Sequence, residues 1–268
     1  ECDAHGRSQR SELFAADRLG DAVVRLYERY ADLLPDGPER TRAAATARSV
    51  AIMGDTDRWA SASWGDGEFV DHRTVGIGSV RGAEGIQRVL GSLLEIADDL
   101  TVRIDDILSL RSDAYILAWT NFGTDRTSGG TFERNFLVLI VYGADGLPTH
   151  TELFDVGHAV EALARFDEIV GSPAEGLTGA TDRAPALRHS RESGKPAELL
   201  DARLRGHDEH VPGTAHRVRR RVRANAATAN AARLDAAMAA RDADAFPLLF
   251  ADDMEAVHHP TGARYARP

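Results

Sequence analysis

The chain is poor in cysteine, aromatic residues and long hydrophobic runs, and each shortage excludes something. Cys2 is its one cysteine in 268 residues, so neither an internal disulfide nor a cysteine-rich zinc site can form. The longest apolar run, residues 136–142 (FLVLIVY), is far too short to span a bilayer. The polar start of the chain has no apolar segment of the secretory type. We therefore expect a cytoplasmic protein with no membrane partner. The missing initiator methionine fits a fragment or a processed piece.

The charge balance also excludes a class of partner. The net charge is −10, so wholesale binding of nucleic acid is disfavoured on electrostatic grounds. The arginine-rich run at residues 217–223 is one short basic stretch in an acidic chain, and we interpret it as solvated. Histidines and acids are scattered without the spacing of a zinc site, and no phosphate-binding GxxxxGK[ST] loop is present. We expect no metal and no cofactor.

The order of elements is helices first and a run of strands afterwards. Apolar residues at three- and four-residue spacing predict helices, and short turns between apolar runs predict antiparallel strands. The expected helices cover residues 19–34, 38–53, 55–62, 83–97 and 157–170. The expected strands cover residues 68–74, 100–110, 114–123, 131–142 and 147–154. Asp145-Gly146 gives the strongest hairpin signal.

The pattern divides the chain into four parts. Residues 1–35 form a helical lead-in and residues 36–170 the main domain. Residues 171–222 are rich in Gly, Pro, Ser, Arg and His, which predicts a flexible linker with one short helix near 196–204. Residues 223–268 return to a helical pattern.

The last part resembles an earlier one. Aligned without gaps, residues 41–74 and 228–261 both contain Glu-x-Val-x-His-x-Thr, which begins at Glu68 and at Glu255. We interpret residues 223–268 as a truncated second copy with helices and a first strand only. Without the later strands such a copy cannot close a core, so we expect it to be marginally stable or docked.

The main domain resembles a known superfamily. The supporting stretches are residues 55–82, 115–155 and 161–169, which include WGDGEFVDHRT, FLVLIVYGADG and EALARFDEI. In content and order they are similar to the nuclear transport factor 2 superfamily, in particular its SnoaL-like, polyketide-cyclase-like branch. More narrowly, they resemble the repeated C-terminal modules of large actinobacterial cyclase- and ATPase-type regulators. The resemblance implies an α+β fold, in which a four-stranded antiparallel meander and a short first strand curve into a cone over three to four helices.

Four residues are candidates for acid–base chemistry. In enzymes of this superfamily a carboxylate in the cone abstracts a proton from carbon, so the resemblance points to Asp71, Glu152 and Asp155, with His72 as acid, base or ligand donor. Strand periodicity puts Asp71 and His72 on opposite faces, so they cannot form a simple dyad. The alternative interpretation gives His72 a structural hydrogen bond and makes Asp71 and Arg73 a surface pair of little energetic value.

Five further residues are candidates for a ligand pocket: Trp64, Tyr115, Trp119, Asn121 and Arg134. Tyr115, Trp119 and Asn121 share one strand face and could form a wall of the cone. Ordinary core packing explains the aromatic residues equally well. Arg134 could bind an anionic ligand, or pair with Asp105 or Glu152.

Three functions follow from this sequence, in order of preference. The first is a non-catalytic accessory module of a larger regulatory protein, binding a small molecule or a protein partner. The second is an isomerase, cyclase or dehydratase that works by proton abstraction. The third is assembly, as a homodimer through the open face of the sheet. We could not match the catalytic residues of the superfamily's enzymes one by one, which favours the first.

Overall fold

The computed structural model describes residues 1–59, 63–97, 99–171 and 225–266, all of which belong to one compact unit. The predicted linker, apart from Gly171, lies outside these residues. So do its short helix near 196–204 and the arginine-rich run at 217–223.

A six-stranded sheet forms the main domain, in the order β3-β2-β7-β6-β5-β4. Its strands are β2 (Glu68–Asp71), β3 (Ser79–Arg81), β4 (Thr101–Arg111), β5 (Ala114–Thr124), β6 (Thr131–Tyr142) and β7 (Pro148–Asp155). Strands β4 to β7 are the predicted antiparallel meander. The first strand, β2, pairs in parallel with the last, β7, so the two ends of the domain meet within one sheet.

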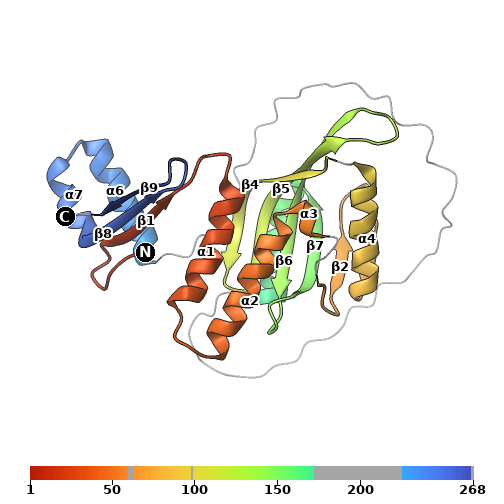
Figure 1. The fold of residues 1–268 in the computed structure, drawn as a ribbon, viewed down its shortest axis with the longest axis horizontal. Helices are drawn as coiled ribbons and strands as arrows, with labels where there is room; N and C mark the ends of the chain where they lie inside the picture. Colours follow the sequence, from red (N-terminus) through yellow and green to blue (C-terminus); the bar gives the residue numbers. More distant parts are fainter. Residues whose placement is uncertain (60–62, 98, 172–224, 267–268) are drawn as a thin grey trace. The chain divides into compact units, whose positions relative to one another are not determined.

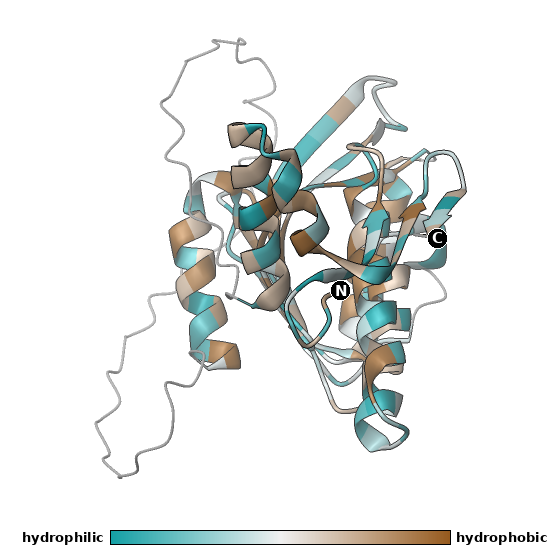
Figure 2. Ribbon diagram, turned by 90° about the vertical axis from the view of Figure 1, so that its left-hand side faces the viewer, coloured by the Kyte–Doolittle hydropathy of each residue, from teal (hydrophilic) through white to brown (hydrophobic). Residues whose placement is uncertain are grey.

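Helices cover both faces of this sheet: Figure 1 shows α1 to α4 on the near side, and α5 packs on the far side. They are α1 (Leu19–Leu33), α2 (Pro38–Met53), α3 (Thr56–Trp59), α4 (Ala83–Ile96) and α5 (Ala159–Val170), with a single 3-10 turn, η1 (Val156–His158), before α5. Pro38 opens α2 because its missing N–H costs nothing in a first turn. The helices in Figure 2 carry both apolar and polar residues. In α1, α4 and α5 the sequence is amphipathic, and buried residues of each helix pack on the sheet.

The core is divided by the sheet. We call the side that packs on α1 to α4 the inner face, where Tyr115, Trp119 and Phe136 belong to one hydrophobic cluster. We call the side that packs on α5 the outer face, where Phe154 and Phe166 belong to a second cluster. Successive residues of a regular strand alternate between the two, so the position of a residue in its strand decides which cluster it joins. In β4 two register shifts interrupt the alternation.

A smaller sheet has the order β1-β8-β9, with β1 at Ser8–Leu13, β8 at Phe250–His258 and β9 at Ala263–Ala266. Its helices are α6 (Ala226–Ala240) and α7 (Phe246–Leu249), preceded by the turn η2 (Ala243–Ala245). Asn225 caps α6 through a capping box with Thr228. The expected C-terminal segment is thus docked, and it is docked on the N-terminal strand β1.

The expected α+β class is confirmed, and the observed bounds follow the predicted ones closely. Strand β1 was not predicted, and residues 1–35 are not simply helical. Strands β3 and β9 were not predicted either; β3 lies in a stretch expected to be a glycine-rich turn. Each of the three has only three to six residues and little alternation, so pairing with a neighbour decides its conformation.

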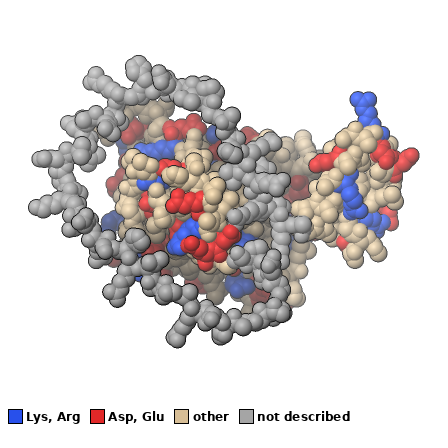
Figure 3. Space-filling view, turned by 180° about the vertical axis from the view of Figure 1, so that it is seen from behind, with Lys and Arg blue, Asp and Glu red and all other residues tan. Residues whose placement is uncertain are grey.

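The described surface carries charges of both signs, mixed over the face that Figure 3 shows. In the described part of the chain, no helix combines the length and the apolar character that crossing a membrane requires.

Candidate functional site

A cluster of charged and polar side chains lies on the outer face, around Glu152 of β7. Its carboxylate is completely buried and accepts a hydrogen bond from His72 Nε2 at 2.8 Å and from Arg165 Nε at 2.9 Å. His150, on the same strand face, donates through its Nε2 to Oε1, the oxygen that Arg165 also binds, whereas His72 binds Oε2. Arg165 comes from α5 and also binds Glu168 at 2.8 Å. We call Glu152, His72, His150 and Arg165 the carboxylate cluster.

This environment fixes the charge of Glu152. Burial by itself would raise the pKa of Glu152, but hydrogen bonds from His150, Arg165 and His72 outweigh it and lower the pKa to about 2. A carboxylate with such a low pKa and three donors is a poor proton acceptor. The cluster therefore holds β2, β7 and α5 together, because its members come from all three.

The structure brings His72 and Glu152 together, but on the outer face. The ring of His72 stacks on Phe154, with centroids 4.6 Å apart, and Phe154 belongs to the cluster under α5. The expectation that His72 lines the cone is therefore wrong. His72 and Asp71 do lie on opposite faces, as expected. However, Asp71 is the one on the inner face and His72 the one on the outer face, which reverses the expected assignment.

Asp71 lies on the inner face, opposite Leu153 of the inner cluster, and its partner Arg73 lies over the ring of Phe136. Its buried carboxylate accepts from Arg73 Nε and Nη2, both at 2.8 Å, and from the N–H of Ile77 at 3.1 Å. Burial would raise the pKa of Asp71, but these hydrogen bonds lower it below its usual value. A Cβ on Gly76 would lie 2.8 Å from Asp71 Cγ, so the turn closes tightly on the carboxylate. Asp71 thus stabilises the turn of residues 72–78, which connects β2 to β3.

Asp155 does not join either group. Its Oδ2 accepts from the N–H of Thr74 at 2.9 Å and from the Thr74 hydroxyl at 2.8 Å. The backbone hydrogen bond from Thr74 is the main reason that the pKa of Asp155 is lowered. The four acid–base candidates therefore occupy separate places, except for the pair of His72 and Glu152.

A cavity of about 820 Å³ opens on the inner face, between α1, α2, β4 and β5, and it is also lined by Phe14, His259 and Pro260. Its apolar wall includes Val23, Val50, Met53, Ile104, Tyr115, Leu117 and Trp119. The carboxylates among its described lining residues, Asp17, Asp21, Glu28 and Asp55, are exposed or half-exposed at its rim. Its volume lies in the range of small-molecule pockets, which runs from about 300 to 1,000 Å³.

Trp119 gives this wall an unusual feature. Its side chain is 3% exposed, and its indole N–H has no hydrogen-bond partner in the part of the chain that the structure describes. The ring itself is packed against Trp59 and Phe136, at centroid distances of 6.1 and 6.4 Å. Buried N–H groups are seldom left without an acceptor, so this one is a candidate donor to a bound molecule.

The other pocket candidates are dispersed. Tyr115 also lines the cavity, but its buried hydroxyl accepts from the Tyr142 hydroxyl at 3.1 Å, and burial raises the pKa of Tyr115 well above its usual value. Asn121 lies opposite Arg134 on the inner face, and its Oδ1 has no partner among the described residues. Arg134 lies over the ring of Phe132, 4.9 Å from its centroid.

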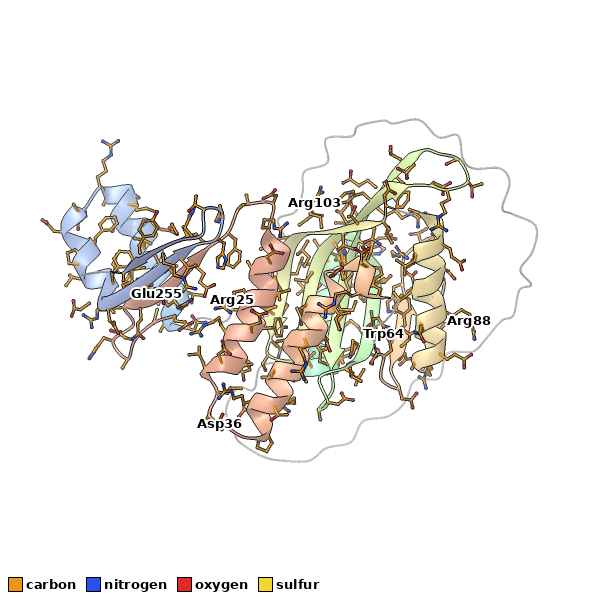
Figure 4. All side chains as sticks on the ribbon, in the orientation of Figure 1. Arg25, Asp36, Trp64, Arg88, Arg103 and Glu255 are labelled. Carbon is orange, nitrogen blue, oxygen red and sulfur yellow. The ribbon has the colours of Figure 1, made fainter. Side chains whose placement is uncertain are left out.

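Trp64 lies apart from Trp119, in the segment before β2, where Figure 4 labels it. It lines a smaller cavity of about 260 Å³ together with Ser49 and Met53. Its indole N–H likewise has no partner among the described residues. The two tryptophans therefore offer equivalent donors in different places.

Neither the carboxylate cluster nor the turn around Asp71 is arranged for a metal. Within residues 1–59, 63–97, 99–171 and 225–266, no three His, Cys, Asp or Glu side chains are placed to hold an ion.

Two members of the carboxylate cluster, His150 and Arg165, were not predicted from the sequence. His150 could have been found, because it lies two residues before Glu152 and shares its strand face. Arg165 gave no local signal.

Comparison with known proteins adds similarity of structure only. No family model matches the chain, and no curated protein matches it. The chain is similar to a hypothetical protein with a ketosteroid isomerase-like fold from Catenulispora acidiphila, in complex with trimethylamine (17% identity over 43% of this chain and 88% of that one, TM-score 0.33). It is similar to a phenazine biosynthesis-related protein of Pseudomonas aeruginosa (17% identity over 57% of this chain and 99% of that one, TM-score 0.36). It is also similar to a candidate SnoaL-like polyketide cyclase of Mesorhizobium loti (13% identity over 41% of this chain and 96% of that one, TM-score 0.33).

Proposed function

We propose that the main domain is a non-catalytic module that binds a small, largely apolar molecule in the inner-face cavity. The observation that carries this function is the unpartnered N–H of Trp119 in an apolar wall. A ligand with a carbonyl or ether oxygen would satisfy that donor and cover the wall. The function as an accessory of a larger regulatory protein belongs to the same proposal.

The placement of the charged groups supports binding over proton abstraction. Among the described residues that line the cavity, the carboxylates are at the rim, and the deep wall is aliphatic or aromatic. His72 and Glu152, the one imidazole–carboxylate pair among the acid–base candidates, are on the other side of the sheet. A base in the cone would have to be near the substrate carbon, and His72 and Glu152 do not meet that requirement. His259 does line the cavity, but its Nε2 is already hydrogen-bonded to Glu12 at 2.9 Å.

The test is a binding measurement on the full chain with a panel of apolar ketones and aromatic ethers, followed by isothermal calorimetry. Trp119→Phe removes the N–H and keeps most of the ring, so the affinity for a carbonyl compound should fall about tenfold, the value of one hydrogen bond near 1.4 kcal/mol.

Trp64→Phe is the matched control, because it removes an equally unpartnered indole N–H from the smaller cavity. The affinity of this variant for the same carbonyl compound should stay within a factor of two of that of the unmodified chain. Equal losses in both variants, or no binding by any compound in the panel, would refute the proposed function.

A further inference from the structure

The carboxylate cluster occurs twice in this chain. We call β2, β7 and α5 the first layer, and β8, β1 and α1 the second layer. In both, a parallel pair of strands has the same register of equivalent residues. The corresponding pairs are Glu68↔His150 with Glu255↔Arg10, Val70↔Glu152 with Val257↔Glu12, and Asp71↔Leu153 with His258↔Leu13.

Glu12 takes the place of Glu152 in the second layer. It accepts from His259 Nε2 at 2.9 Å, from Arg25 Nε at 2.9 Å and from Arg10 Nε at 2.9 Å. Arg25 also binds Glu28 at 3.1 Å, as Arg165 binds Glu168 in the first layer. Burial would raise the pKa of Glu12, but hydrogen bonds from Arg25, His259 and Arg10 lower it to about 2.

The stacking of a histidine on a phenylalanine is also repeated in the second layer. His259 stacks on Phe14 with centroids 4.1 Å apart and planes at 14°, against 4.6 Å and 15° for His72 on Phe154. The N–H of His259 donates to the carbonyl of Leu13 at 3.0 Å, and that of His72 to the carbonyl of Leu153 at 2.9 Å. The likeness therefore extends to the backbone.

Even the turn before the strand is the same. Gly6 and Gly146 both have positive φ, of 72° and 76°. Gly6 donates to the carbonyl of Asp3 at 2.9 Å, and Gly146 to the carbonyl of Gly143 at 3.0 Å. Glycine suits this left-handed conformation in each turn.

The sequences agree with the contacts. Residues 3–28 align with residues 143–168 without gaps. The identical pairs are Ala4/Ala144, Gly6/Gly146, Glu12/Glu152, Leu13/Leu153, Phe14/Phe154, Ala22/Ala162, Arg25/Arg165 and Glu28/Glu168. Most of them are residues that the turn, the cluster or the ring contact requires. Chance similarity would not be concentrated in this way.

We propose that β1 with α1 is a docking element, that β8 is its acceptor edge, and that the element of one copy of this chain is received by the acceptor of a second copy. The partner is specified by its chemistry: a strand with Glu-Leu-Phe, followed by a helix that brings an arginine back to the glutamate. Backbone pairing supplies the affinity, and the glutamate and histidine select the register. Exchange of such an element between identical chains is a direct route to dimers.

The test uses two charge reversals in the full chain. Glu12→Arg spoils the pairing, because the introduced arginine meets the ring of His259 in place of the carboxylate that accepts its hydrogen bond. His259→Glu spoils the acceptor, because the introduced glutamate faces Glu12. Figure 4 shows Arg25 on α1 and Glu255 on β8, the two elements that take part.

Each reversed chain alone should be a monomer by light scattering and should lose hydrogen-exchange protection of the β8 amides. An equimolar mixture should give twice the monomer mass, since the introduced arginine then meets the introduced glutamate, and the unchanged Glu12 meets the unchanged His259. The chain with both reversals should regain the β8 protection by itself. A mixture that stays at the monomer mass, or reversals that leave β8 protected, would overturn the proposal.

Protection of the β5 amides, which lie in the main domain, reports whether a variant is folded. If a reversal unfolds the whole chain, Arg10→Glu and Glu255→Arg reverse another pair in the same register and have the same expected masses. As a matched control, Glu161→Arg mixed with Arg88→Glu reverses charges on exposed positions of α5 and α4, and this mixture should remain monomeric.

Discussion

The two layers hold an equivalent carboxylate at different depths. Glu152 has a fully buried side chain, in a sheet of six strands covered by helices on both faces, whereas the Glu12 side chain is 12% exposed and its strand is the edge of three. Hydrogen bonds that are nearly identical therefore have different consequences. In the first layer they belong to the core of the domain, while in the second they provide much of what joins two distant segments.

Acid should have the largest effect, because it acts on both layers. Glu152 and Glu12 have folded pKa values of about 2, below the usual value of 4.5. A carboxyl group with a depressed pKa contributes stability that is complete above about pH 4.5 and is lost as the pH falls toward 2. Urea unfolding at pH 7, 4 and 3 should therefore show a falling midpoint. A midpoint that is constant across this window would contradict the ion-paired description of both layers.

Glu152→Gln should have the next largest effect. It leaves His72, His150 and Arg165 around a buried neutral group, and breaking a buried charge cluster typically costs about 3–5 kcal/mol. We expect a loss of about 3 kcal/mol in the free energy of unfolding, measured by urea denaturation. Glu168→Gln is the control, since Glu168 is 66% exposed and should cost about 0.5 kcal/mol or less.

Glu12→Gln should have the smallest effect on global stability and a clear local one. The main domain keeps its core, so the free energy of unfolding followed at β5 should change by less than about 1 kcal/mol. The amides of Val257 and His259 should exchange faster, because the second layer opens by itself. Equal losses of protection at β5 and at β8 would show that the two layers open together, contrary to the comparison.

Much of the main domain could be predicted from its sequence. The strands β4 to β7 alternate or form apolar runs between clear turns, and their observed bounds fall within two residues of the predicted ones. The split between Asp71 and His72 also follows from the period of a strand. Local pattern is sufficient where the hydrophobic alternation and the turn residues indicate the same structure.

The orientation of the site could not be predicted. Both faces of this sheet are covered by helices, so Phe69 and Val70 gave no indication of which one points into the cavity. The partners of Glu152 come from positions 72, 150 and 165, and only the folded chain brings the first and last of them together. Strand β1 has the sequence SQRSEL, with a single large apolar residue, so its conformation depends on β8.

The parallel pairing of β1 with β8 has a consequence for the order of folding. The hydrogen bond from His259 to Glu12 spans 247 residues, against 80 for that from His72 to Glu152, and the longer loop costs about 1 kcal/mol more chain entropy to close. At a synthesis rate of about 5–20 residues per second, Leu13 and Phe14 wait roughly 10–50 seconds on the ribosome before β8 exists. During that interval strands β2 to β7 can form their sheet, while β1 still waits for the strand with which it pairs.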